Sequence, residues 1–238
     1  MENFLPKVYI IILNWNGLQD TVECLESLKK ITYQNCKILI IDNGSKIDEA
    51  KILKDKFGDF IETIRSDKNL GFAGGNNIGF DYALDNNADM ILILNNDTIV
   101  NPDFLEKMVS KMESNIGMVA CKVLNYYKRK EINAMWSAVH RCGSFKGKGY
   151  GMTDIGQYDD REYVFGPSGC CALLSAKMLE DIKKIEGNYF DDDLFAYHED
   201  IDLAFRAQMR NWKCVFVPDA IVYHKHSQSL EKSGDRSP

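Results

Sequence analysis

The sequence has no apolar run of about eighteen residues, the length that a membrane-spanning helix requires. Its N-terminal segment also lacks the basic start, the long apolar stretch and the small-residue cleavage site of a secretory signal peptide. The seven cysteines are odd in number and include no Cys-x-x-Cys pair. We therefore expect a cytoplasmic protein whose cysteines are reduced and mostly buried.

Positive charge is scarce, because 29 basic residues stand against 35 acidic ones and the net charge is −6. A mildly acidic protein is a poor non-specific binder of nucleic acid, so we expect no nucleic-acid partner. The chain shows no internal repeat, low-complexity tract or linker. Its 238 residues, 45% of them hydrophobic, suffice for one sizeable core, and we predict a single domain over residues 1–238.

Apolar runs of strand length alternate with helical patterns in the first half of the chain. The runs are continuous, which is typical of parallel strands that are buried on both faces. The pattern predicts an α/β fold with an open, mostly parallel sheet flanked by helices. Strands are expected at residues 8–13, 37–41, 60–65, 90–94 and 118–124, and helices at 21–29, 47–57, from the glycine-rich stretch to 84, and at 102–113.

After Asn125 the pattern loosens, and residues 125–165 have no clear period. We interpret this segment as a long excursion with a small hairpin or a mobile loop. Helices are expected again at 175–185 and 199–211, and strand-like pieces at 214–217 and 220–223. The last helix has an apolar stripe at helical spacing that is predicted to face the core, formed by Ile201, Ala204, Phe205 and Met209.

Polar clusters directly follow the predicted strands, at the carboxyl edge where open α/β sheets bind ligands. Asn95, Asn96 and Asp97 follow the 90–94 strand. Asp97 can ligate a hard divalent cation, which would bridge two phosphates; the alternative is an Asx-rich turn that caps the next helix. His224 follows a late strand-like piece and can ligate a Mn²⁺-like ion, with a surface histidine near a frayed terminus as an equal alternative.

Two further clusters are compatible with a nucleotide. Asp42 follows the second strand, where its carboxylate can accept the N–H of a pyrimidine or hold a ribose hydroxyl; a simple turn is an equal alternative. The stretch 69–77 contains Gly71 and Gly74 and opens a helix, so its N–H groups can face an anion. Its alternative is a flexible loop with an asparagine as the helix cap. The stretch matches neither the P-loop pattern nor the dinucleotide fingerprint.

Two acids, Glu199 and Asp200, stand where the 199–211 helix begins, and their charges suit the positive end of a helix. Asp202, Arg206 and Arg210 form a polar stripe at helical spacing, which we interpret as the solvated face. Asp200 lies off this stripe and can serve as a general base. The alternative is that the two acids only cap the helix.

The order of these motifs resembles glycosyltransferase family 2, of the GT-A fold, and especially its rhamnosyltransferase-like branch. The likeness covers nearly the whole chain and is weakest over residues 125–163. Taken together in this order the motifs are highly specific, although each alone is not. The matching segments are IIILNWNG at 10–17, IDNGS at 41–45, NLGFAGGNN at 69–77, LNNDT at 94–98, FGPSGCCALLSAKML at 165–179, YHEDIDLAFR at 197–206 and VPDAIVYHKHS at 217–227.

The resemblance implies roles for single residues. Asp97 matches the last carboxylate of a metal-binding Asp-x-Asp motif, whose first acid is Asn95 here, and this departure removes one charged ligand. Asp200 matches the catalytic base, and His224 matches a histidine that ligates the metal in some members. A Mg²⁺ or Mn²⁺ cofactor is implied. The implied nucleotide-binding residues are Asn14, Asp42, Asn69, Gly71, Gly74, Asn95 and Asn96.

The resemblance also implies the reaction, an inverting transfer of a sugar from a nucleoside-diphosphate donor of the dTDP-rhamnose or UDP-sugar type. The acceptor would be a hydroxyl group of a glycan or of a lipid-linked saccharide, the latter with peripheral membrane contact. Residues 1–124 would form the nucleotide-binding half and 125–238 the acceptor-side half. Nothing in the sequence indicates an oligomeric state.

Other functions stay open. A nucleotidyltransferase would carry a glycine-rich loop with Arg or Lys after the first strand, where this chain has Asn-Trp-Asn-Gly. A non-catalytic carbohydrate- or nucleotide-binding subunit that keeps the fold is favoured by Asn95 and disfavoured by the presence of both Asp97 and Asp200. An NAD-dependent oxidoreductase is disfavoured by the missing fingerprint.

Overall fold

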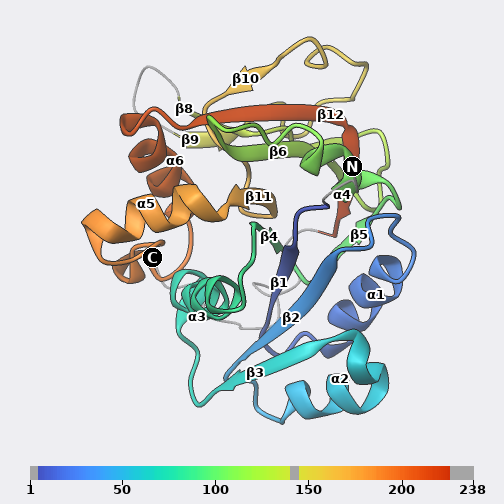
Figure 1. Ribbon diagram of the computed structural model, residues 1–238. Helices are drawn as coiled ribbons and strands as arrows, with labels where there is room; N and C mark the ends of the chain where they lie inside the picture. Colours follow the sequence, from blue (N-terminus) through green and yellow to red (C-terminus); the bar gives the residue numbers. More distant parts are fainter. Residues whose placement is uncertain (1–4, 140–144, 226–238) are drawn as a thin grey trace.

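The computed structural model describes residues 5–139 and 145–225, which form one large sheet with helices on both faces (Figure 1). In the first half of the chain, four strands are parallel to their neighbours in the order β4-β1-β2-β3. They are β1 (Val8–Asn14), β2 (Cys36–Asn43), β3 (Glu62–Ser66) and β4 (Met90–Leu94). The expected α/β class with a mostly parallel sheet is confirmed.

The second half of the chain extends the same sheet from β4. The strand β11 (Cys171–Ser175) lies antiparallel between β4 and β6 (Ile116–Asn125), and β12 (Lys213–His224) runs parallel to β6. The short strands β5 (Thr98–Val100) and β10 (Tyr163–Val164) pair with β12, and β7 (Ile132–Ala134) pairs with β6. A separate antiparallel pair joins β8 (Ser137–Val139) to β9 (Phe145–Gly147).

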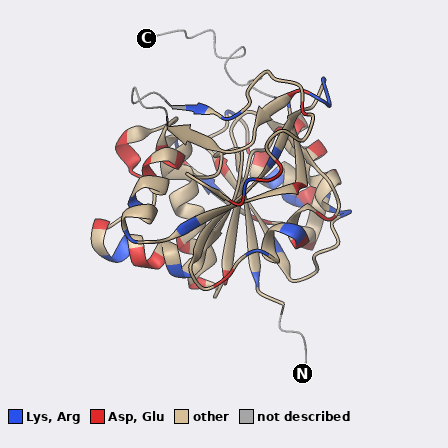
Figure 2. Cartoon of the chain, turned by 90° about the horizontal axis from the view of Figure 1, so that it is seen from above, with Lys and Arg blue, Asp and Glu red and all other residues tan. Residues whose placement is uncertain are grey.

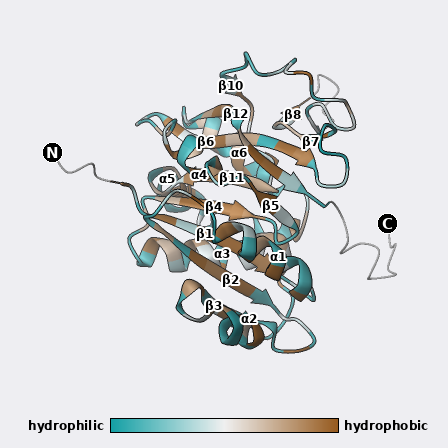
Figure 3. Ribbon diagram, turned by 90° about the vertical axis from the view of Figure 1, so that its right-hand side faces the viewer, coloured by the Kyte–Doolittle hydropathy of each residue, from teal (hydrophilic) through white to brown (hydrophobic). Residues whose placement is uncertain are grey.

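Each face of the sheet carries its own hydrophobic core, because successive residues of a strand point to opposite faces. Ile10 and Ile12 of β1 pack in the core under α1 (Leu18–Leu28), α2 (Glu49–Phe57) and α4 (Phe104–Val109). Tyr9 and Ile11 pack in the core under α3 (Gly71–Asp85), α5 (Ala176–Glu186) and α6 (Glu199–Met209). Figure 3 shows apolar strands between helices that are more polar on their outer sides.

Charged residues of both signs are mixed over the flanking helices and loops, whereas the strands carry few of either (Figure 2). Within the described ranges, no helix is long and apolar enough to cross a membrane. The six cysteines in those ranges form no disulfide, and all except Cys36 are buried, as the sequence predicts. Cys142 lies outside the described residues.

The parallel register brings the ends of several strands to one edge of the sheet. Asn14 at the end of β1 pairs with Asp42 near the end of β2, and β4 lies on the other side of β1. The polar residues that follow these strands therefore meet there, as the sequence predicts.

The predicted apolar stripe of α6 is wrong in its second half. Ile201 and Ala204 are buried, but Phe205 is 40% exposed and Met209 is 83% exposed. The buried face runs through Leu203 and Ala207 instead, because these side chains join the core shared with α3 and α5. Phe205 still has a partner, since its ring packs on Phe165 with centroids 4.7 Å apart.

Several element bounds also differ from the predicted ones. The helix α1 begins three residues earlier than expected, and α4 ends at Val109 instead of near residue 113. The two strand-like pieces near the C-terminus form one strand, β12, with an irregularity between Val217 and Ile221. The sequence pattern does not predict the antiparallel strand β11. The described part of the excursion over 125–165 contains four short strands, of which the antiparallel β8–β9 pair agrees with the expected small hairpin.

Candidate active site

Asp97 and His224 lie together although they are far apart in the sequence. Asp97 follows β4 in the turn to β5, and the first residue of β5, Thr98, pairs with His224 at the end of β12. The Nε2 atom of His224 is 3.0 Å from Oδ1 of Asp97, and each residue is only 8% exposed. The side-chain amide of Asn95 lies 3.4 Å from the same Nε2 atom. This edge of the sheet thus gathers a carboxylate, an imidazole and an amide.

Asn133 of β7 fixes the orientation of His224. Its Oδ1 atom lies 3.0 Å from Nδ1 of His224, and an amide oxygen can only accept a hydrogen bond, so Nδ1 carries a proton. The opposite ring nitrogen, Nε2, is thereby directed at Asp97. Outer-shell partners of this kind orient histidine ligands in metal sites. Sequence reasoning missed Asn133, because it lies in the segment 125–165 that shows no period.

A divalent cation fits this edge only in part. One carboxylate oxygen and one imidazole nitrogen, 3.0 Å apart, can contact one ion. Among the described residues, however, no three His, Cys, Asp or Glu side chains gather closely enough to hold a metal by themselves. The protein therefore supplies an incomplete set of ligands, which the oxygens of a bound diphosphate would complete.

A buried polar network lies beside this edge, between β1, α1 and α2. Asn14 donates to Oε2 of Glu49 at 2.7 Å and accepts from the hydroxyl of Thr21 at 2.7 Å. The backbone N–H of Gly17 also donates to Glu49, at 3.1 Å, and the amide of Asn96 donates to Thr21 at 3.0 Å. Two predicted nucleotide-binding residues, Asn14 and Asn96, thus belong to one network. Glu49 was missed, because it lies in a helix whose charged pattern resembles a solvated surface.

Asp42 is fully buried at the end of β2. Its two carboxylate oxygens accept the backbone N–H groups of Ser45, at 3.1 Å, and of Ala50, at 3.3 Å. Arg65 of β3 approaches the carboxylate at 3.9 Å. Asp42 therefore holds the turn between β2 and α2, and only its remaining lone pairs are left for a nucleotide.

The glycine-rich stretch is mostly helix, since α3 begins at Gly71. The N–H of Gly71 is taken by Oδ1 of Asn69 at 2.9 Å, and the N–H of Ala73 by the carbonyl of Phe195 at 3.1 Å. Two donors of the first turn are thus engaged within the protein. Gly74 lies one turn further along the helix, where an added Cβ would come 3.0 Å from Leu70.

Asp200 is anchored at the start of α6. Its Oδ2 atom accepts from the backbone N–H of Gly169 at 2.9 Å and from the hydroxyl of Ser137 at 3.1 Å. Burial raises the pKa of Asp200, and these two donors oppose the rise. Burial and the neighbouring charge of Asp200 raise the pKa of Glu199 from 4.5 to about 7. Within the described residues, Oε2 of Glu199 is buried and has no hydrogen-bond partner.

Gly169 and Cys170 connect the two parts of the candidate site. The N–H of Gly169 binds Asp200, while the carbonyl of Cys170 accepts the N–H of Asn95 at 2.9 Å. Two successive residues thus link the carboxylate at the start of α6 to the end of β4. A Cβ at position 169 would lie 3.6 Å from both Oδ2 of Asp200 and Oε1 of Glu199, so glycine leaves this space open beside the two acids.

Comparison with known proteins gives a consistent set of relatives. Residues 9–183 match the model of a family described as Glycosyl transferase family 2. A low-salt glycan biosynthesis hexosyltransferase of Haloferax volcanii is 25% identical over 98% of this chain and 71% of its own length. A dTDP-rhamnosyl transferase of Shigella flexneri is 26% identical over 92% of this chain and 69% of its own length.

A solved structure supports the same fold. The mannosyltransferase from Pyrobaculum calidifontis, in complex with GDP-Man and Mn²⁺, superposes with a TM-score of 0.69 at 15% identity. The match covers 95% of this chain and 59% of the mannosyltransferase chain. This likeness shows the GT-A fold, an α/β architecture with the large, mostly parallel sheet described above.

Proposed function

The chain belongs to glycosyl transferase family 2, and on that premise we propose that it transfers a sugar from a nucleoside-diphosphate donor to a hydroxyl acceptor. The observation that carries the proposal is the link through Gly169 and Cys170 between Asp200 and the Asp97–His224 edge. This arrangement brings a candidate base close to residues that can serve the diphosphate of a donor. The acceptor is a glycan or a lipid-linked saccharide, and the site of action is cytoplasmic.

Asp200 acts as the general base in an inverting displacement. Its carboxylate takes the proton of the acceptor hydroxyl while the hydroxyl oxygen attacks the anomeric carbon. The bond from that carbon to the diphosphate breaks, and the diphosphate leaves with the electron pair. Ser137 and Gly169 keep the carboxylate aimed during this step. A buried carboxylate with a raised pKa suits this role, because it takes a proton more readily than an exposed one.

The leaving diphosphate lies at the carboxyl edge of the sheet. Asp97 and His224 would hold a divalent cation there, Mg²⁺ or Mn²⁺, which when bound neutralises the charge of the diphosphate. Asn95 takes the place of a second acid, so the affinity for the cation depends on the diphosphate being present. The nucleotide-binding residues are Asn14, Asp42, Asn69, Gly71, Gly74, Asn95 and Asn96.

The donor is a dTDP- or UDP-sugar. A dTDP-rhamnosyl transferase and a hexosyltransferase are among the relatives, which favours a deoxyhexose or hexose as the transferred group. Because Asp42 is fully buried, it acts on the nucleotide mainly through the turn that it holds between β2 and α2.

Calorimetric titration with dTDP, UDP and GDP, each with and without Mn²⁺, tests the proposal. We expect one of the first two nucleotides to bind best, and Mn²⁺ to strengthen its binding. Release of nucleoside diphosphate from dTDP-rhamnose or UDP-glucose then separates an enzyme from a binding subunit. If no nucleoside diphosphate binds under either condition, the proposal fails. Binding without any release from the sugar donors would favour a non-catalytic subunit.

A further inference from the structure

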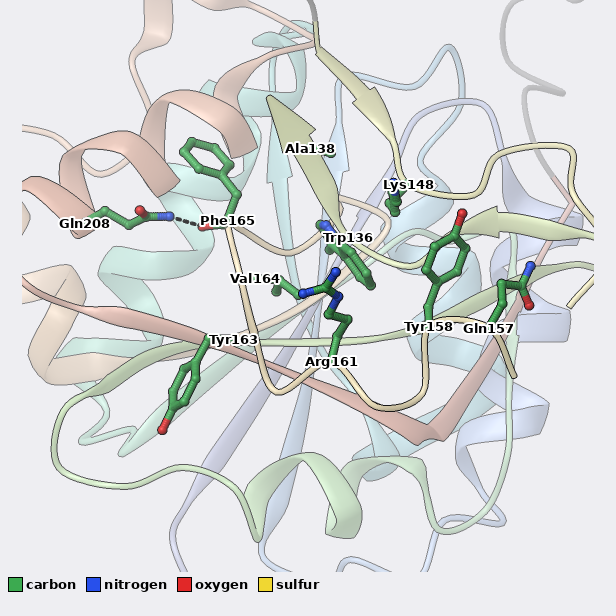
Figure 4. A pocket seen from close by; sticks show the side chains of 10 residues that line it. All are labelled: Trp136, Ala138, Lys148, Gln157, Tyr158, Arg161, Tyr163, Val164, Phe165 and Gln208. Atoms are coloured by element: carbon green, nitrogen blue, oxygen red, sulfur yellow. Dashed lines mark hydrogen bonds between the residues drawn. The ribbon is translucent and has the colours of Figure 1, made fainter. Parts of the chain in front are cut away.

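A cavity of about 520 Å³ lies outside the candidate active site. It is lined by Trp136, by Lys148, by residues of the stretch 157–165, and by Gln208 near the end of α6 (Figure 4). Its size is within the range of small-ligand sites. Almost all of its lining comes from the excursion between β6 and β11, and none of the roles proposed above uses the lining residues.

Aromatic rings form one wall of the cavity. The indole of Trp136 is only 8% exposed and packs edge to face on Tyr158 and Phe216, with ring centroids 5.6 and 5.2 Å apart. Phe165 is held against Phe205 of α6. Tyr163 contributes less, because Figure 4 shows its ring directed away from the centre of the group. The wall is therefore rigid, and an apolar ring face can pack on it at little cost in side-chain entropy.

The charged side chains of the lining are both cations. Lys148 lies with its Nζ atom 5.3 Å from the centre of the Tyr158 ring, and Arg161 reaches toward Trp136 in Figure 4. Over residues 5–139 and 145–225, neither cation forms an ion pair with an acidic side chain. The nearby acids Asp154 and Asp159 are engaged by Lys122, at 2.9 and 2.8 Å. The lining thus presents two cations that no acidic side chain of the described residues neutralises by an ion pair, although Asp160 and Glu162 flank Arg161 in the sequence.

We propose that this cavity binds an anionic saccharide, a sugar unit of the acceptor glycan that bears a carboxylate or a phosphate group. The guanidinium of Arg161 can pair with such an anion through two parallel hydrogen bonds, and Lys148 adds a second positive charge. The apolar face of the sugar ring packs on the aromatic wall. Gln208 offers its amide group to the hydroxyls and is held in place by its bond to the carbonyl of Phe165.

The saccharide in this cavity is not the one that reacts. Trp136 and Ala138 line the cavity, whereas Ser137 between them donates to Asp200. Because alternate residues of a strand point to opposite faces, β8 separates the cavity from the candidate base. The bound unit is therefore a remote part of the acceptor, and its binding energy helps to hold β8 and the Ser137–Asp200 contact in place. This inference rests on the proposed function.

Trp136 is a built-in reporter for the test. The protein is labelled with ¹⁵N at its three tryptophans, and the indole signal of Trp136 is assigned with Trp136→Phe. Methyl β-glucuronide and glucose 6-phosphate are titrated as anionic probes, and methyl β-glucoside as the neutral one. We expect saturable shifts of the Trp136 signal with at least one anionic probe and much weaker binding of the neutral sugar.

Paired variants separate the cavity from general electrostatics. In Lys148→Gln/Arg161→Gln, we expect the affinity for the anionic probe to fall by about tenfold or more, as the loss of charge-assisted hydrogen bonds implies. The control Lys30→Gln/Lys37→Gln removes the same charge from exposed positions elsewhere and should change the affinity less than about twofold. The inference is overturned if no anionic probe binds saturably, if the neutral sugar binds equally well, or if both double variants weaken binding equally.

Nucleotide binding provides the independent check. Titration of the Lys148→Gln/Arg161→Gln protein with dTDP or UDP and Mn²⁺ should match the wild type, because the cavity lies away from the carboxyl edge. If nucleotide binding is absent in the wild type while the anionic sugar binds, the proposed function fails and the cavity remains a saccharide site. If nucleotide binds normally and no anionic sugar does, only the cavity assignment fails.

Discussion

Asp200 accepts hydrogen bonds on both carboxylate oxygens, from Gly169 and Ser137 on Oδ2 and from the backbone N–H of Ile201 on Oδ1, which fixes the plane of its carboxylate. In Asp200→Asn the donors Gly169 and Ser137 can still bind an amide oxygen, so the loop should keep its shape. We expect turnover to fall by about 10²–10⁴-fold, the usual contribution of a general base. Affinity for dTDP or UDP with Mn²⁺ should stay within about twofold of the wild type, because the base touches only the acceptor side.

The measurement for Asp200 is the rate of diphosphate release from the sugar donor at saturating donor, with calorimetry of nucleotide binding on the same protein. Asp193→Asn is the matched control, since it makes the same change at an exposed position just before α6. Near-normal turnover in Asp200→Asn would remove Asp200 from the role of base.

The pair of Asn133 and His224 gives a second test on single residues. Asn133 accepts a hydrogen bond from the ring of His224 and so directs Nε2 at Asp97. We expect His224→Ala to abolish the strengthening of nucleotide binding by Mn²⁺. Asn133→Ala should weaken the effect of Mn²⁺ by about 10–100-fold, as losses of outer-shell partners do, whereas Asn133→Asp keeps an acceptor and should retain most of it.

Calorimetry of dTDP or UDP, with and without Mn²⁺, compares these three variants with the wild type. If His224→Ala keeps the full effect of Mn²⁺, His224 is not a ligand. If Asn133→Ala and Asn133→Asp behave alike, the histidine does not depend on this hydrogen bond.

Among the secondary-structure elements, α3 shows why the sequence needs its glycines. A Cβ at Gly79 would come 2.7 Å from Cγ2 of Ile11 in β1, and one at Gly75 would come 2.4 Å from Leu13. Glycine therefore lets this helix approach the central strand closely. The sequence pattern of repeated glycines predicts a stretch that opens a helix, and two of its four glycines, Gly75 and Gly79, serve helix–strand packing inside α3.

Gly79→Ala should therefore destabilise the protein, although alanine is the better helix former. The gain in helix propensity is about 1 kcal/mol, whereas overpacking of a tight core contact costs about 1–3 kcal/mol. We expect a net loss in the free energy of unfolding, measured by urea denaturation. Asp85→Ala, at an exposed position in the same helix, should stay within about 0.5 kcal/mol or gain slightly. A more stable Gly79→Ala protein would contradict the close packing of α3 on β1.

How well the sequence predicts an element depends on how local its determinants are. The strands β1 and β4 are continuous apolar runs because both of their faces are buried, so they were predictable. The strand β11 was missed, since its antiparallel place between β4 and β6 depends on contacts across the sheet. Phe205 was assigned to the core by spacing alone, although its partner Phe165 comes from the irregular excursion.

The candidate site divides in the same way. Asp97 and His224 could be placed together from the strand ends alone, because parallel strands share one carboxyl edge. Asn133 and Glu49 could not, since each reaches its partner through a tertiary contact that leaves no periodic signal. A buried glutamate such as Glu49 can be recognised only when its three hydrogen-bond donors are seen around it.

For the molecule as a whole, both cores receive residues from the two halves of the chain. The core under α1 includes Val8 and Val222, and the core under α3 includes Tyr9 and Phe216. The halves 1–124 and 125–238 therefore share their packing, and we expect them to unfold together. The free energy of unfolding of the whole chain then also depends on the ionisation of Glu199 and Asp200 at the start of α6.

That site should make stability fall as the pH rises toward neutrality. Burial, and next the charge of Asp200, raise the pKa of Glu199 from 4.5 to about 7 in the folded protein. Between these values the folded state holds a proton that the unfolded chain has released, so the stabilisation is complete below pH 4.5 and is lost as the pH rises through about 7. Asp200, whose pKa burial also raises, contributes with the same sign.

The variant Glu199→Gln tests this effect, because it removes the contribution of Glu199. The free energy of unfolding is measured by urea denaturation at about pH 5 and at about pH 8. Its decrease between these two pH values should be smaller in the variant than in the wild type, by up to about 3 kcal/mol. Comparing the two proteins cancels the titrating groups that do not interact with Glu199, whereas the coupled Asp200 belongs to the measured difference. An equal loss in both, or a wild type that gains stability relative to the variant with rising pH, would show that Glu199 is ionised in the folded state throughout this range.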